Sequence, residues 1–284
     1  MLTKLQAVNA GSYDIIIASD YIIDIARKTG GLLKELDKSL LPNFANLEEG
    51  YLDQYFDPDN IYTMPYGPGT PLIVYDPERV NFEIKGFKDL WNPELKDSLV
   101  LIDDARVLLG MALLSMGESM NTQDEALIEE AGKRLDQLKD NIRLLSYNNL
   151  QTAILSGEAS AGYMFTTQSS QAIAENPGLK IVYPEEGMGV GIDSMFIPLN
   201  APNSDNAHAF MNYLLEPEVS AKIATGVMVP CVNKESAALL PEWYTTNGAL
   251  FIPSDKLTKT EFITDVGPAT EIFDRVWTKF KQSY

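Results

Sequence analysis

Apolar positions along the chain fall into two patterns, which predict two kinds of element. Short runs rich in apolar residues predict strands, and these runs lie at 14–18, 72–75, 99–102, 142–146, 159–165 and 180–183. Apolar residues spaced three and four apart predict helices, and these stretches lie at 2–8, 21–28, 105–116, 124–138, 149–156 and 261–281. Because strands and helices alternate, we expect an α/β fold whose sheets are mainly parallel.

The stretch 187–224 organises the rest of the chain. It opens with the glycine-rich segment Gly187–Gly191, which predicts flexible or closely approached backbone. Asp193 follows as a buried acid at the mouth of a short apolar strand, and Phe210 and Tyr213 then mark the apolar spacing of a helix. This order is typical of a chain that crosses between two lobes with a ligand in the cleft.

Composition and charge narrow the classes of function. The net charge of −18 over 284 residues argues against nucleic acid as a partner, because phosphates would be repelled. It is compatible with a cationic ligand, although an acidic solvated surface explains it equally well. The single cysteine, Cys231, and the single histidine, His208, exclude an internal disulfide, a multi-histidine zinc site and a histidine-dependent triad. We expect no metal and no cofactor, and we place His208 on a helix surface.

Polar residues follow two of the predicted strands, where open α/β sheets bind ligands. Ser19 and Tyr21 come after the strand 14–18, and Asp103 and Asp104 come after the strand 99–102. We expect Asp103 to cap the following helix and Asp104 to face the cleft. An enzyme would use the two acids as a general acid/base pair, but adjacent side chains do not face one another, and no nucleophile accompanies them. We therefore expect no enzymatic activity.

Several short motifs resemble bacterial extracellular solute-binding proteins of the spermidine/putrescine type. The matching segments, in order, are Tyr13–Ile16, Ser19–Tyr21, Pro42–Phe44, Phe56–Pro58, Pro65–Tyr66, Asp89–Trp91, Asp103–Arg106, Ser156–Glu158, Pro184–Gly187, Asp193–Ser194, Phe196–Pro198, Ala207–Val219 and Asp265–Gly267. Each motif alone is weak, but their order over nearly the whole chain is specific. The resemblance implies the substrate-binding component of an ABC importer, with a membrane permease as its partner.

The resemblance also implies a two-lobed, type II periplasmic-binding-protein-like fold with the ligand cleft between the lobes. The first lobe would take 1–67 and 193–237, and the second 68–192 and 238–284. Family members begin with further strands that have no match here, so we expect an incomplete first lobe and association through oligomerisation or strand exchange. The family is exported, which implies a location in the periplasm or, as a lipoprotein, on the outer face of the cell membrane. We expect no export signal within this sequence, because its first residues lack a continuous apolar core.

The resemblance carries a set of ligand contacts onto this sequence. The implied ligand-binding residues are Ser19, Tyr21, Thr70, Asp104, Phe165 and Asp193. Carboxylates would pair with ammonium groups, and rings would line the alkyl chain. Four positions depart from the family, each with the loss of a polar or aromatic side chain: Val107, Gly191, Val229 and Ile263. These losses favour putrescine over spermidine and leave two alternatives, namely another solute such as an amino acid derivative or sugar, and an enzyme or interaction protein on the same fold.

Overall fold

The computed structural model describes residues 12–284, so the helix expected at 2–8 lies outside the described residues. The chain divides into two compact units. Unit 1 runs up to Gly69 and resumes over Gly191–Glu242, while unit 2 comprises Thr70–Val190 and Trp243–Tyr284.

Unit 1 is built on a small antiparallel sheet. Its helices and strands are β1 (Ile16–Ala18), α2 (Asp20–Thr29), β2 (Thr63–Gly69), the second part of β8 (Met188–Phe196), α7 (Ser204–Leu214) and α8 (Pro217–Val227). β8 lies between β1 and β2 and is antiparallel to both. The expectation of parallel pairing is therefore wrong for the described part of unit 1. The physical reason is that β2 leads out of this unit and β8 leads back into it, so the two neighbours run in opposite directions.

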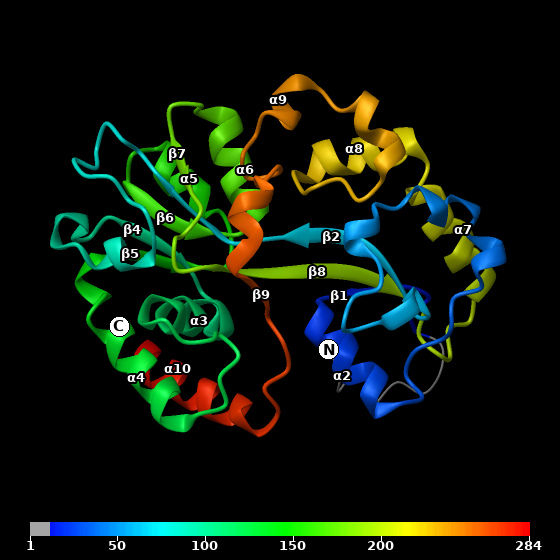
Figure 1. The fold of residues 1–284 in the computed structure, drawn as a ribbon, viewed down its shortest axis with the longest axis horizontal. Helices are drawn as coiled ribbons and strands as arrows, with labels where there is room; N and C mark the ends of the chain where they lie inside the picture. Colours follow the sequence, from blue (N-terminus) through cyan, green and yellow to red (C-terminus); the bar gives the residue numbers. More distant parts are fainter. Residues whose placement is uncertain (1–11) are drawn as a thin grey trace. The chain divides into compact units, whose positions relative to one another are not determined.

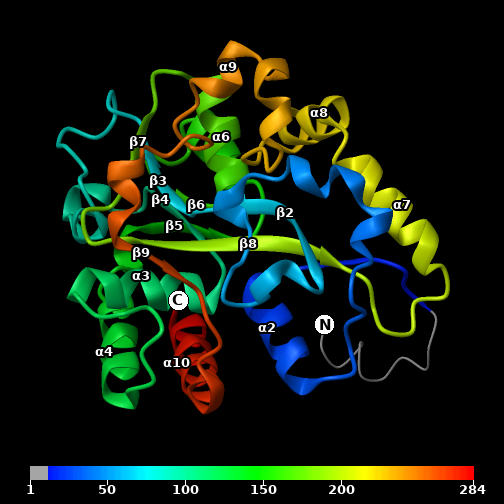
Figure 2. The ribbon, with the colours of Figure 1, turned by 45° about the vertical axis from the view of Figure 1, so that its right-hand side comes forward.

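The core of unit 1 lies between its sheet and α7. Met64 of β2 and Met195 of β8 pack against Met211 of α7. The helix α2 lies on the other side of β8 (Figures 1 and 2). His208 is buried on the inner face of α7, where its Nε2 accepts the amide N–H of Asp37 at 3.0 Å. Its expected place on the helix surface is therefore wrong, because backbone partners satisfy the imidazole inside the unit.

Unit 2 contains a mixed sheet with the strand order β5-β4-β6-β3-β7. Its helices and strands are β3 (Leu72–Tyr75), β4 (Leu99–Ile102), α3 (Ala105–Met116), α4 (Glu125–Asp136), β5 (Ile142–Ser146), α5 (Leu150–Leu155), β6 (Ala161–Met164), α6 (Thr166–Glu175), β7 (Lys180–Val182), β9 (Thr260–Phe262) and α10 (Thr270–Ser283), with α9 (Glu242–Thr245) at the boundary between the units. β4 is parallel to β5 and β6, whereas β3 is antiparallel to β6 and β7. The carboxyl ends of β4, β5 and β6 consequently meet at one edge of the sheet.

Helices cover both faces of the sheet in unit 2. The helices α3, α4 and α10 lie on one face, and α5 and α6 lie on the other (Figures 1 and 2). The helix expected over 261–281 begins only at Thr270, because β9 precedes it and pairs in parallel with Met188–Val190 of β8. The segment Gly187–Gly191, expected to be flexible, therefore lies mostly within a continuous strand.

Candidate functional site

In unit 1, Ser19 and Asp193 form a polar pair at the end of β1. Ser19 is the N-cap residue of α2, but its side chain makes no capping hydrogen bond. Its hydroxyl instead donates to the carboxylate of Asp193 on β8, a contact that lowers the pKa of this acid, whereas partial burial has the larger effect and raises the pKa. Asp193 is exposed to solvent, so the expectation of a buried acid is wrong at this position.

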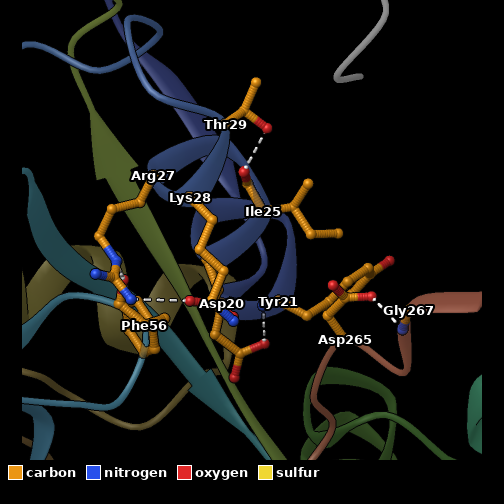
Figure 3. A network of polar contacts seen from close by, with 10 residues as sticks. Asp20, Tyr21, Ile25, Arg27, Lys28, Thr29, Phe56, Asp265 and Gly267 are labelled. Carbon is orange, nitrogen blue, oxygen red and sulfur yellow. Dashed lines mark hydrogen bonds and ion pairs between the residues drawn. The ribbon is translucent and has the colours of Figure 1, made fainter.

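One of the buried acids of unit 1 is Asp20, the first residue of α2. It is 1% exposed, and its Oδ1 accepts the amide N–H of Tyr21 at 2.7 Å (Figure 3). Its Oδ2 accepts the amide N–H of Ile192 on β8 at 3.3 Å. Burial raises the pKa of Asp20 to about 7, and the nearby charges of Asp193 and Asp24 add to this shift.

Tyr21 lies directly after Asp20 in the first turn of α2 and is half-buried. The same unit has a shallow surface hollow, lined by residues of β2, α7, α8 and the loop 229–232. Val229 and Tyr66 line this hollow, but none of the six implied ligand contacts does. In unit 1, Ser19, Tyr21 and Asp193 thus lie at one end of β1, and the hollow is lined by other residues.

In unit 2, the capping role expected of the first acid after β4 is wrong. Asp104, not Asp103, is the N-cap of α3, and its Oδ1 accepts the amide N–H of Val107 at 3.0 Å. Asp103 instead forms an ion pair with Lys281 of α10. The charge of Asp104 also contributes, after burial, to a raised pKa of Tyr163 on β6. One oxygen of Asp104 caps the helix, and the same carboxylate stands at the edge where the parallel strands end.

An aromatic pair marks the same edge of unit 2. Phe165 follows β6 and Tyr147 follows β5, and their ring centroids are 5.3 Å apart at an angle of 58°. Tyr147 is 57% exposed. Gln168, in the first turn of α6, donates from Nε2 to the carbonyl oxygen of Tyr147 at 3.2 Å, while its buried Oε1 has no hydrogen-bond partner. Sequence reasoning missed Tyr147 and Gln168, although both stand within a few residues of the ends of parallel strands.

Thr70 and two of the positions that depart from the family make contacts within unit 2 itself. The backbone N–H of Thr70 donates to Oγ1 of Thr166 at 2.7 Å, and this hydroxyl donates back to the carbonyl oxygen of Thr70 at 2.9 Å. The buried residue Val107 belongs to the core of unit 2, and Ile263 packs against that core. A ligand-binding role for Thr70 stays a prediction.

The described residues offer chemistry for organic cations rather than for metal ions. No group of three or more His, Cys, Asp or Glu side chains within 12–284 is placed to hold a metal. Over the same residues, no helix combines the length and apolar character needed to cross a membrane. What they do offer is carboxylates without ion-pair partners in unit 1, and at the strand ends of unit 2 an aromatic pair and a carboxylate.

Comparison with known proteins identifies the class. Residues 11–257 match the family described as bacterial extracellular solute-binding protein, and this chain belongs to that family. A spermidine/putrescine-binding periplasmic protein of Salmonella typhimurium is 34% identical over 282 residues, which cover 99% of this chain and 81% of the relative.

Solved structures agree with this assignment. The spermidine/putrescine ABC transporter substrate-binding protein of Streptococcus pneumoniae is 31% identical, with a TM-score of 0.86 over 99% of this chain and 87% of that one. A lipoprotein of Treponema pallidum is 26% identical with the same TM-score and coverage. The predicted two-lobed, periplasmic-binding-protein-like α/β fold is thereby confirmed.

Proposed function

We propose that this protein is the substrate-binding component of an ABC importer and that it binds putrescine or a closely related small cation. Relatives that are 33–34% identical are named spermidine/putrescine-binding periplasmic proteins, and they match nearly the whole chain. The observation that supports the proposal for this chain is the contact between Ser19 and Asp193. The Ser19 hydroxyl holds the Asp193 carboxylate in position, and this carboxylate makes none of the ion pairs among the described residues. A carboxylate of this kind is suited to an ammonium group, with which it forms a charge-assisted hydrogen bond.

Each unit contributes its own chemistry to this proposal. In unit 1, Asp193, Ser19 and Tyr21 would bind an ammonium group and adjoining methylenes. In unit 2, Asp104 would bind a second ammonium group, with the Phe165 ring facing the cation or the alkyl chain. The division into first and second lobes and the ligand role of Thr70 belong to the same proposal. The loss of polar side chains at Val107 and Ile263 favours the shorter diamine over spermidine.

The partner and the location follow from the same proposal. We infer a membrane permease of the ABC type as partner and a location outside the cytoplasm, as in the periplasmic relatives. Among the described residues, β1 pairs with β8 along one edge only, and its Ile17 is 41% exposed. We propose that a second copy of the chain pairs with the other edge by strand exchange. Sedimentation analysis should then show a dimer that Ile17→Lys weakens, whereas a monomer at all concentrations would contradict strand exchange.

Titration calorimetry tests the ligand. Putrescine should bind more tightly than spermidine, and glucose and neutral amino acids should give no heat. Cadaverine and γ-aminobutyrate serve as probes of chain length and charge. If γ-aminobutyrate or a sugar binds while millimolar putrescine and spermidine do not, the polyamine assignment is wrong, and the four departing positions mark a site rebuilt for a different solute.

A further inference from the structure

Asp20 is a buried carboxyl group with no cation beside it among the described residues. It is 1% exposed, and the two hydrogen bonds that it accepts come from the backbone amides of Tyr21 and Ile192. None of the ion pairs formed by the described residues includes it. Because ionised side chains are rarely buried without a partner, this arrangement calls for either a proton or an external cation.

The charged groups that face Asp20 are both acidic. Asp24 lies one turn further along α2, and Asp193 lies on the neighbouring strand β8. The carboxylate of Asp24 is already balanced, since it accepts from Arg27 at 3.0 Å and from Lys28 at 2.6 Å. Asp193 has no such balance and receives only the hydroxyl of Ser19. Asp20 and Asp193 are therefore the two acids of unit 1 that share an uncompensated site.

Gly191 shapes the space around this pair. A Cβ atom placed at Gly191 would lie 3.7 Å from Oδ2 of Asp20. A longer side chain at this position would therefore lie against the carboxylate. Gly191 places no side chain against Asp20 on the strand that also carries Asp193.

We propose that Asp20 and Asp193 together form a receptor for one ammonium group in unit 1, and that the cation enters in exchange for a proton. This inference rests on the proposed function. In the free protein near neutral pH, the pair holds one proton and one negative charge, because burial disfavours the charged form of Asp20 and the nearby charge of Asp193 adds to this effect. When R–NH₃⁺ arrives, the proton leaves Asp20 for solvent, and both carboxylates then accept hydrogen bonds from the ammonium group. The amine stays protonated throughout, so one proton is released for each cation bound.

The exchange makes binding depend on pH in a defined direction. Below about pH 7 the incoming ammonium group must displace the proton of Asp20, and above it the carboxylate is already charged. Putrescine affinity should therefore rise about tenfold between pH 6 and pH 8 and then level off. A group that both carboxylates bind must donate several N–H bonds, so tetramethylammonium, which has none, should bind far more weakly.

Titration calorimetry of putrescine at pH 6, in buffers of different ionisation enthalpy, counts the released protons. The wild-type protein should release close to one proton per putrescine at pH 6 and almost none at pH 8.5. Asp20→Asn should bind putrescine with no proton release and with an affinity that does not change with pH. Asp205→Asn removes the same charge from an exposed position at the start of α7 and should behave as the wild type.

The outcomes separate this inference from the function on which it rests. If wild-type protein binds putrescine at pH 6 without releasing a proton, or if Asp20→Asn releases as many as the wild type, the exchange is refuted and polyamine binding stands. If wild-type protein binds neither putrescine nor spermidine at millimolar concentration at either pH, the proposed function fails and the exchange fails with it. The wild-type proton count needs no variant, so a misfolded Asp20→Asn protein does not block the test.

Discussion

Replacing Asp20 by Asn should change how the stability of the ligand-free protein depends on pH. The folded protein raises the pKa of Asp20 from 3.8 to about 7. An unfolded chain therefore loses this proton near pH 4, whereas the folded chain keeps it until about pH 7. Stability falls as the pH rises through this window, because the folded state binds more protons than the unfolded state. Above pH 7 the full penalty applies, and below pH 4 it disappears.

The expected change in the free energy of unfolding follows from the pKa shift of Asp20 and from the two hydrogen bonds that its carboxylate accepts. At 1.36 kcal/mol per pKa unit, the penalty on the folded state is about 4 kcal/mol at pH 8 and about 2 kcal/mol at pH 5. Asn carries no charge and escapes this penalty, but its Nδ2 cannot accept the Ile192 amide, which costs roughly 1–3 kcal/mol. The variant should therefore be close to the wild type at pH 5 and more stable at pH 8. Between the two, the difference should move by about 3 kcal/mol in favour of the variant.

Urea denaturation at pH 5, 6, 7 and 8 measures this difference. Circular dichroism is the suitable signal, because all three tryptophans, Trp91, Trp243 and Trp277, belong to unit 2 and do not report on the unit that holds Asp20. Asp205→Asn is the control and should differ from the wild type by the same small amount at every pH. A difference for Asp20→Asn that stays constant from pH 5 to pH 8 would refute a raised pKa at this carboxyl group.

Three further expectations concern binding and packing. Asp193→Asn should weaken putrescine binding about a hundredfold or more in calorimetry while leaving the melting temperature of the free protein nearly unchanged, since Asp193 is exposed and without an ion pair. Phe165→Ala should weaken it about 3- to 30-fold, the value of a cation facing a ring, and an unchanged affinity would remove Phe165 from the site. His208→Ala should lower the free energy of unfolding by roughly 1–3 kcal/mol in urea titrations, because the amide of Asp37 loses its acceptor; a change below 0.5 kcal/mol would contradict a structural role for the imidazole.

The elements of unit 2 are largely readable from the sequence. The apolar run 99–102 and the helical spacing 105–116 coincide with β4 and α3, because each element is buried against its neighbours over its whole length. The helix α7 shows the limit of this reading. Both 209–210–213–214 and 207–208–211 have helical spacing, and apolar character favoured the first set. The structure buries the second, because Asp37 and Ser204 satisfy the two ring nitrogens of His208.

The roles of individual acids depend on details that apolar patterns do not record. The residue at which α3 begins determines which of the two acids, Asp103 or Asp104, is its N-cap. A shift of one residue moves the cap from one acid to the other. Pairing direction in unit 1 was missed for a related reason. An apolar run predicts that a strand is buried but carries no information on the direction of its neighbour, and the neighbour of β1 comes from the distant segment Ser194–Phe196.

The sequence did not indicate a binding role for Asp20, because its neighbours already explain an acid at this position. Ser, Asp and Tyr after a strand are typical of the start of a helix, and a carboxylate in the first turn is favourable there. The feature that changes its meaning is Ile192, whose amide approaches Asp20 across 172 positions of the chain, together with Gly191, which places no side chain against the carboxylate. Read singly, Gly191 is a lost contact and Asp20 is a helix residue. Considered together, Gly191 lacks a side chain at the place where Asp20 supplies a second carboxyl group near Asp193. The charge state of Asp20 then determines the free energy of binding a cation.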